Sequence, residues 1–230
     1  MNVPAFWEDT LLGFRVADGF SRPKNELVER FRSIPTAIIS DNMHRIFAGG
    51  TGLRPLHGDA VLCGSALTVR TRPGDNLMVH KALDIAKPGD VIIVDASGDM
   101  TNAIIGEIML NYAISRGVAG FVIDGAVRDS TAIAKGGLPV YARGVTHRGP
   151  YKDGPGEVGV TVTVGGMVVS SGDIVVGDED GLLAIPQSHA EGILKLAIAQ
   201  YDREAEILRS IAEGTVDRSW VDQTLSAKGL

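Results

Sequence analysis

The sequence predicts an α/β protein in which a mostly parallel sheet is covered by helices and backed by a second layer made only of strands. Two observations support this prediction. In the middle of the chain, short apolar runs such as residues 91–94 and 121–124 alternate with helical patterns, which is typical of parallel strands buried on both faces. After residue 142, short strand patterns are separated only by glycine-rich or acidic turns, which indicates antiparallel hairpins.

The length and composition of the chain indicate one domain with modest additions. It has 230 residues, 44% of them apolar, which is enough for a substantial core. A net charge of -6 without a cluster of Lys and Arg argues against a nucleic-acid partner. A single cysteine, Cys63, excludes an internal disulfide, and the sequence contains neither a membrane-spanning apolar run nor a secretory signal pattern. These features predict a cytoplasmic protein without a membrane partner.

In the first half of the chain, the expected elements are bounded by glycine, proline or helix-capping residues. Residues 1–25 show no clear period and are expected to form an N-terminal extension that packs on the body or on a neighbouring chain. The elements expected next are a helix over 26–31, a helix over 36–47 that opens at Pro35, strands over 59–64 and 65–71, a helix over 77–86 and a strand over 91–94.

The second half begins with a helix over 107–116, a strand over 121–124 and a short helix over 130–135. The short strands expected after them lie over 158–164, 167–170, 173–177 and 181–185. An amphipathic helix over 188–213 follows, with an apolar stripe formed by Ala190, Leu194, Ala197, Tyr201, Ala205 and Leu208. We therefore divide the chain into the extension (1–25), a main domain (26–187) and a C-terminal helix and tail (188–230).

Two short motifs form the most informative feature of the sequence. The first is Gly106-Glu107-Ile108-Met109 at the start of a predicted helix, and the second is Arg128-Asp129 directly after a predicted strand. A ten-residue helix covers about 15 Å and five strand residues cover about 16 Å, so the chain runs out and back by equal lengths. Glu107 and Arg128 are therefore expected side by side, at the strand ends where ligands of open α/β sheets collect.

These residue types suit one small acid and one divalent cation. Backbone N–H groups at the start of a helix bind a carboxylate, and the planar guanidinium of Arg128 binds the same anion through two hydrogen bonds. Asp129 is then available for a hard cation such as Mg²⁺. A purely structural interpretation stays open, in which Arg128 and Asp129 cap the helix that begins at Ser130 and Glu107 is an ordinary first-turn acid.

Several separate motifs also occur in the order that a known family has. They are Gly106-Glu107, Gly117-Val118-Ala119-Gly120, Val122-Ile123-Asp124-Gly125-Ala126-Val127-Arg128-Asp129, Ala142-Arg143-Gly144-Val145-Thr146 and Lys152-Asp153-Gly154-Pro155-Gly156-Glu157. Over residues 36–186 the sequence resembles the 4-hydroxy-4-methyl-2-oxoglutarate aldolase family, which also contains the RraA regulators of ribonuclease E. The resemblance implies a swivelling β/β/α sandwich, like that of phosphohistidine domains, assembled as a homotrimer or homohexamer.

The resemblance also implies a reaction and roles for individual residues. The implied reaction is a metal-dependent (class II) aldol cleavage of 4-hydroxy-4-methyl-2-oxoglutarate, or of 4-carboxy-4-hydroxy-2-oxoadipate, that releases pyruvate and is accompanied by oxaloacetate decarboxylation. Arg128 and Glu107 are then expected to be catalytic, and Asp129 to hold Mg²⁺ or Mn²⁺. The residues expected to bind the 2-oxo acid substrate are Gly106, Glu107, Ile108, Met109 and Arg128.

A non-catalytic protein is the competing prediction, namely an RraA-like regulator that binds ribonuclease E. An acidic residue at the position of Glu107 marks the aldolases of the family, so this residue favours the enzyme. The aldolases also take an acid from the C-terminal helix of a neighbouring subunit, and Glu204 and Glu206 are the candidates for that role.

Other chemistry-bearing residues fit less well. The five histidines lack the spacing of a zinc site. A Schiff-base lysine needs an apolar pocket, but Lys152 is expected in a polar turn, and Lys81 and Lys135 on surface helices. Ser97-Gly98-Asp99 follows a strand but lacks the three spaced glycines of a dinucleotide-binding loop. The sequence therefore does not support nicotinamide or adenosylmethionine cofactors.

Overall fold

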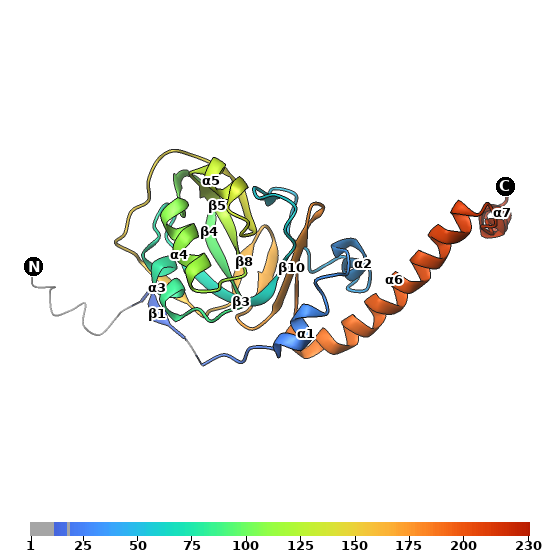
Figure 1. Cartoon of the computed structure of the whole chain (residues 1–230), viewed down its shortest axis with the longest axis horizontal. Helices are drawn as coiled ribbons and strands as arrows, with labels where there is room; N and C mark the ends of the chain where they lie inside the picture. The colour runs from blue at the N-terminus through green and yellow to red at the C-terminus, as the bar shows by residue number, and fades with distance from the viewer. Residues whose placement is uncertain (1–11, 18) are drawn as a thin grey trace, which may run out of the picture.

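The structure, a computed structural model, describes residues 12–17 and 19–230 (Figure 1). Its strands are β1 (Phe14–Val16), β2 (Arg54–Pro55), β3 (Leu62–Thr71), β4 (Asp90–Ala103), β5 (Gly120–Val127), β6 (Val140–Val145), β7 (Gly156–Val158), β8 (Val162–Val164), β9 (Met167–Val169), β10 (Ile174–Asp178) and β11 (Gly181–Ile185). Its helices are α1 (Asn25–Glu29), α2 (Thr36–Asp41), α3 (Leu77–Ile85), α4 (Glu107–Ser115), α5 (Ser130–Lys135), the 3-10 turn η2 (Gln187–His189), α6 (Ala190–Ala212) and α7 (Ser219–Ser226).

Four parallel strands in the order β3, β4, β5 and β6 form the centre of the main sheet. β5 is buried along its whole length, and β3 and the first half of β4 are buried at nearly every position. Such strands are stable only when both faces of the sheet are covered. β7 extends the sheet antiparallel to β3, β1 pairs with β7, and β2 pairs antiparallel with β6. The predicted parallel sheet is thus confirmed.

Helices α3, α4 and α5 cover one face of the parallel sheet (Figure 1). Val79, Leu110 and Ile133 come from these three helices and pack in one buried cluster with Ile92 and Phe121 of the sheet. Because this cluster lies directly beneath the start of α4, it fixes the position of the helix whose first turn contains Glu107.

The other face of the parallel sheet packs against the second, all-β layer. β8 and β9 form an antiparallel hairpin, and β10 pairs antiparallel both with β11 and with the first part of β3. Val164 and Leu182 of this layer share a cluster with Ile93 of β4, whereas the preceding Ile92 points to the helical side. The predicted β/β/α sandwich with antiparallel hairpins is therefore confirmed.

A third cluster lies between the β-layer and helices α1, α2 and α6. The first half of α6 contributes Leu194 and Ala197 to it, but the helix then leaves the body and runs outward as a long arm (Figure 1). Within this chain only the first half of the predicted apolar stripe is buried, because Tyr201 and Leu208 are 45% and 66% exposed. Helices in the described part of the chain are too short or too polar to cross a membrane.

The described part of the N-terminal extension packs on the body, in agreement with the prediction. β1 pairs in parallel with β7, and Arg22 donates hydrogen bonds of 2.7 and 2.8 Å to the two carboxylate oxygens of Asp90, which is 1% exposed. Residues 1–11 of the same predicted extension lie outside the described residues. The domain boundaries at 25/26 and 187/188 stay a prediction.

The predicted helix over 36–47 is wrong at its end, because α2 stops at Asp41. The side-chain amide of Asn42 donates a 2.9 Å hydrogen bond to the Ile38 carbonyl, which also accepts the backbone N–H of Asn42. His44 and Arg45 then have φ of 56° and 63°, a left-handed conformation in which the helix cannot continue.

Strand boundaries differ from the predictions where glycines were interpreted as breaks. The single strand β3 replaces the strands predicted over 59–64 and 65–71, because Gly64 marks a close approach and not a turn. A Cβ there would lie 2.5 Å from the Gly89 carbonyl oxygen. Conversely, Gly159, with φ of 79°, divides the strand predicted over 158–164 into β7 and β8.

The strand predicted over 91–94 is also too short, because β4 continues to Ala103. Ser97 and Gly98 have φ of 56° and 71°, and the pairing of β4 with β5 shifts register on either side of Asp99. These residues form an irregularity inside the strand instead of ending it. β4 therefore ends level with β5, so the residues that follow the two strands lie at the same edge of the sheet.

Asp124 is a buried polar link between the two layers. Its side chain accepts a hydrogen bond from Nε of Arg143 and one of 2.7 Å from the N–H of Gly165, in the β8–β9 turn. Asp124 is 5% exposed, and a buried carboxylate is stable only with such partners. This side chain therefore ties β5 to the hairpin that covers it.

Replacing Asp124 by alanine is expected to lower the free energy of unfolding by about 3 kcal/mol, because the Gly165 N–H and the Arg143 guanidinium lose a charged acceptor. Urea unfolding measures the change. The matched control is Asp59→Ala, which removes an exposed acid and should change stability by less than about 0.5 kcal/mol. Equal unfolding midpoints for the two variants would show that the link does not stabilise the sandwich.

Candidate active site

The two motifs that the sequence singles out meet beyond the carboxyl ends of β4 and β5. These strands are parallel neighbours, so the residues that follow them lie at the same sheet edge. The Ile104 N–H donates to the Ala126 carbonyl at 2.8 Å, and the Arg128 N–H donates to the Ile105 carbonyl at 3.0 Å. These two bonds carry the pairing past the strand ends and bring Gly106 next to Arg128.

A single hydrogen bond then joins the motifs: the Glu107 N–H donates to Oδ2 of Asp129 at 2.9 Å. The donor is in the first turn of α4, where the helix has no carbonyl to accept it. Gly106 is necessary for this approach, because a Cβ there would collide with the same Oδ2 and lie 2.9 Å from Cγ of Arg128. We call Gly106, Glu107, Arg128 and Asp129 the strand-end site.

The structure corrects the purely structural interpretation of Asp129. Asp129 does occupy the N-cap position of α5, with a left-handed φ of 57°, but its side chain makes no cap hydrogen bond to that helix. It caps α4 instead, through the Glu107 N–H. The predicted cap at Ser130 is therefore wrong, and the capping interaction connects the two motifs to each other.

Arg128 lies between two cavities. Its Nε is 3.6 Å from Oδ2 of Asp129, and the two side chains are 40% and 42% exposed, so both are accessible to a ligand. Glu107, Asp129 and Arg128 line the first cavity. The second is lined by Arg128 and by the remaining predicted site residues, Gly106, Ile108 and Met109. The structure thus brings all the predicted site residues together, with Arg128 shared between the cavities.

The first cavity, which we call the Asp129 cavity, has a volume of about 660 Å³ and extends over α5 and the loop after β6. Its two carboxylates suit Mg²⁺ or Mn²⁺, which retain several water ligands. Within the described residues, both contacts of the Asp129 carboxylate use Oδ2, which leaves Oδ1 for a cation. The same residues contain no group of three or more His, Cys, Asp or Glu placed to hold a metal, so this chain alone offers a site of one or two carboxylates.

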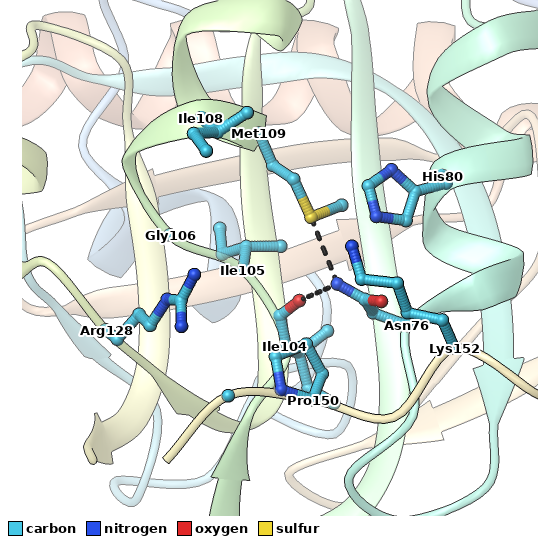
Figure 2. Close-up of a pocket in the computed structure, with 11 residues that line it drawn as sticks. Asn76, His80, Ile104, Ile105, Gly106, Ile108, Met109, Arg128, Pro150 and Lys152 are labelled. Atoms are coloured by element: carbon cyan, nitrogen blue, oxygen red, sulfur yellow. Dashed lines mark hydrogen bonds between the residues drawn. The ribbon is translucent and has the colours of Figure 1, made fainter. Parts of the chain in front are cut away.

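The second cavity, which we call the Asn76 cavity, has a volume of about 230 Å³. It lies between the start of α3, the start of α4 and the loop that contains Pro150 and Lys152 (Figure 2). Figure 2 shows Arg128 on one side of the cavity and His80 and Lys152 on the opposite side. Ile104, Ile105 and Met109 supply apolar surface between them.

Asn76, His80 and Lys152 are candidate functional residues that the sequence analysis missed. The sequence analysis expects only that a capping residue bounds the helix over 77–86, and it places Lys152 in a polar turn. The sequence gives little indication that Lys152 lies near Asn76 and His80, because Lys152 is far from both along the chain and only tertiary contacts bring it to them. The one available signal is the polar turn at 74–76, which lies at the same sheet edge as the strand-end site.

Burial shifts the pKa values of His80 and Cys63. Burial lowers the pKa of His80 below its ordinary value, the positive charge of Lys152 lowers it further, and Asp84 opposes the shift. The His80 ring is therefore neutral at neutral pH. Burial raises the pKa of the Cys63 thiol to about 12, so this cysteine is not a nucleophile near neutrality.

The chain belongs to the RraA-like family. The family model, described as Aldolase/RraA, matches residues 36–184, nearly the range over which the sequence resembles that family. A curated relative from Halalkalibacterium halodurans, named "Putative 4-hydroxy-4-methyl-2-oxoglutarate aldolase", is 40% identical over 177 residues, which cover 77% of this chain and 84% of the relative.

Solved structures support the same fold. RraAS2 of Streptomyces coelicolor, described as an unusual member of the RNase ES inhibitor RraA protein family, has a TM-score of 0.74 and 27% identity over 82% of this chain and 99% of its own. The RNA-processing inhibitor RraA from Thermus thermophilis has a TM-score of 0.62 and 33% identity over 66% of this chain and 92% of its own. The family thus includes proteins named for chemistry and proteins named for inhibition.

The pKa of His80 is expected to lie below 6.5 in an NMR titration of the histidine rings. In Lys152→Met it should rise but stay below 6.5, because burial is the larger cause. Burial favours the neutral His80 ring in the folded state. Its contribution to the free energy of unfolding is therefore fully present above the unfolded-state pKa of His80 and is lost as the pH falls through the folded-state pKa. Lys195→Met, which removes a distant exposed charge on α6, is the control. A His80 pKa that is the same in Lys152→Met and in the wild type would contradict the proximity of the two residues.

Proposed function

We propose that this protein is a divalent-metal-dependent lyase that cleaves 4-hydroxy-4-methyl-2-oxoglutarate, or the related 4-carboxy-4-hydroxy-2-oxoadipate, to pyruvate and a second 2-oxo acid. One observation carries the proposal: an acid, a guanidinium, a second acid and a helix N-terminus meet at one sheet edge, joined by the 2.9 Å Glu107–Asp129 hydrogen bond. The 40% identity to a relative with an aldolase name supports the same activity.

In the proposed complex, the 2-oxo acid lies at the start of α4. The Glu107 N–H already donates to Asp129, so the carboxylate of the substrate is left to the N–H groups of Ile108 and Met109 and to Arg128. Gly106 keeps the approach open, because a side chain there would press on Arg128 and Asp129. These residues therefore bind and orient the substrate.

The reaction breaks the C3–C4 bond of the substrate. The electron pair of this bond stays with C3 and is delocalised into the C2 carbonyl as an enolate, while the C4 hydroxyl loses its proton and becomes the carbonyl of the second product. Arg128 faces the C2 oxygen, where negative charge develops, and stabilises it. Glu107 accepts the hydroxyl proton through a water molecule, and protonation of C3 then gives pyruvate.

Asp129, with Glu107 beside it, would hold Mg²⁺ or Mn²⁺, which supplies Lewis-acid polarisation of the 2-oxo group. Oxaloacetate that loses CO2 passes through the same enolate, so Arg128 would stabilise that reaction as well. Oxaloacetate decarboxylation is therefore part of the proposed activity.

We further propose that the enzyme works as a homotrimer or homohexamer in the cytoplasm. The arm of α6 exposes apolar side chains, including those of Tyr201 and Leu208, which a neighbouring chain would cover. Glu204 and Glu206 lie on this arm and are the candidates for completing a neighbour's site. Within this chain Glu204 accepts a 2.7 Å hydrogen bond from Gln200.

A regulator that binds ribonuclease E without chemistry is the competing function, since the Streptomyces and Thermus relatives are described as inhibitors. The exposed Arg128–Asp129 pair favours the enzyme. Inhibition by surface contact does not require a guanidinium and two carboxylates at the border of two cavities.

The wild-type protein with added Mg²⁺ is expected to release pyruvate from 4-hydroxy-4-methyl-2-oxoglutarate. EDTA should stop the release and excess Mg²⁺ should restore it, because polarisation of the 2-oxo group depends on the cation. Turnover that persists in EDTA would exclude the metal requirement. A metal-loaded protein that releases no pyruvate but binds ribonuclease E would support the regulator.

Arg128→Ala is expected to lower kcat for pyruvate release by about 10²–10³-fold, because it removes the group that faces the developing oxyanion. Arg128→Lys should recover only part of the loss, since an ammonium lacks the planar fork. Arg30→Ala, which removes an exposed guanidinium at the end of α1, is the matched control. Unchanged turnover in Arg128→Ala would show that the reaction takes place elsewhere.

A further inference from the structure

We propose that Phe14 of β1 is a positioning residue for the candidate active site, because it holds the loop over residues 146–155 that forms one wall of the Asn76 cavity. The inference rests on the proposed lyase function and extends it to the N-terminal extension, which contains none of the predicted site residues. Phe14 acts through the loop and does not itself contact the substrate.

The loop connects β6 to β7 and supplies Gly149, Pro150 and Lys152 to the lining of the Asn76 cavity. Lys152 lies on the side of the cavity opposite Arg128 (Figure 2). A loop without a helix or strand of its own depends on contacts with other elements for a fixed position. The position of this wall, and with it the width of the cavity, therefore depends on what holds the loop.

The turn before α3 is the first element that holds the loop. The carboxylate of Asp75, which is fully buried, accepts hydrogen bonds of 2.8 and 2.9 Å from the N–H groups of Asp153 and Gly154. The Tyr151 N–H donates to the Gly74 carbonyl at 2.8 Å. These backbone bonds attach the loop to the turn, but they place no side chain over it.

β1 is the second element, and it supplies that side chain. A Cβ at Gly154 would lie 2.5 Å from Cε1 and 2.9 Å from Cζ of Phe14, so the ring packs directly on the Gly154 backbone. The Gly156 N–H donates a 2.6 Å hydrogen bond to the Gly13 carbonyl, which fixes β1 at the end of the loop. Phe14 thus covers the loop two residues after Lys152.

Phe14 adds little to the core itself. It is 43% exposed and belongs to none of the three buried clusters of the described residues. Its removal should therefore loosen the loop without unfolding the sandwich. Val16 offers a matched control, because it lies on the same strand and is 42% exposed, but it is paired with Val158, beyond the loop.

Phe14→Ala is expected to raise KM for 4-hydroxy-4-methyl-2-oxoglutarate by about three- to tenfold, because the loop must then be ordered when the substrate binds. kcat should stay within about twofold of the wild-type value, because Arg128 and Glu107 keep their positions. Phe14→Leu, which keeps an apolar contact, should restore most of the KM, and Val16→Ala should leave it unchanged. A KM that Phe14→Ala does not alter, or that Val16→Ala alters equally, overturns the inference.

Amide hydrogen exchange measures the loop directly and needs no substrate. The N–H groups of Asp153 and Gly154 should exchange at least about threefold faster in Phe14→Ala than in the wild type, because the loop opens more easily. Val16→Ala should keep the wild-type rates. Equal exchange in Phe14→Ala and in the wild type overturns the inference, even if KM changes.

A binding experiment separates the positioning role from the proposed reaction. By calorimetry with Mg²⁺ present, Phe14→Ala should bind 2-oxoglutarate about three- to tenfold more weakly than the wild type. If the wild type releases no pyruvate but affinity and exchange both depend on Phe14, the positioning role stands and the lyase proposal fails. If pyruvate is released and neither quantity depends on Phe14, the lyase function stands and the positioning role is overturned.

Discussion

The strand-end site depends on one hydrogen bond, from the Glu107 N–H to Oδ2 of Asp129. β4 and β5 run in parallel, and backbone hydrogen bonds continue their pairing to Ile105 and Arg128 before the chain turns into α4 after one strand and towards α5 after the other. The Glu107–Asp129 bond joins the first turn of α4 to the residue that precedes α5. It is possible only because Gly106 leaves room for the Asp129 carboxylate. An acid, a guanidinium and free helix N–H groups are thereby held in one fixed relation.

The capping role and the proposed metal role of Asp129 support each other. A carboxylate at a helix N-terminus is stabilised by the dipole, typically by about 0.3–1 kcal/mol, and is held in one orientation by the N–H that it accepts. Metal-binding carboxylates generally need such a second partner to orient them. Since the Glu107 N–H uses Oδ2, the cap fixes the direction in which Oδ1 faces the Asp129 cavity. The hydrogen bond by which Asp129 caps α4 thus also holds its carboxylate in position for the proposed metal ion.

Sequence predicted the features that depend on local pattern. The parallel sheet was predictable because β5 is buried at every position and carries no polar side chain except that of Asp124. The meeting of Glu107 with Arg128 was predictable because it follows from the length of one helix and one strand. The end of α2 was not, since it depends on the left-handed backbone at His44 and Arg45, nor was the continuation of β4 through Ser97 and Gly98. The Asn76 cavity lay furthest from prediction, because hydrogen bonds between residues more than seventy positions apart create it.

The fold alone does not decide between chemistry and inhibition, because relatives with each name share it. What differs among proteins of one fold is the side chains at the sheet edge. Here Glu107, Asp129 and Lys135 line one cavity, and Arg128 lies between this cavity and the Asn76 cavity. A surface that only docks a protein gains nothing from a guanidinium and a helix N-terminus placed beside two acids. A small acid with a metal ion uses all of them, because its carboxylate meets the N–H groups and the guanidinium while the two acids meet the cation.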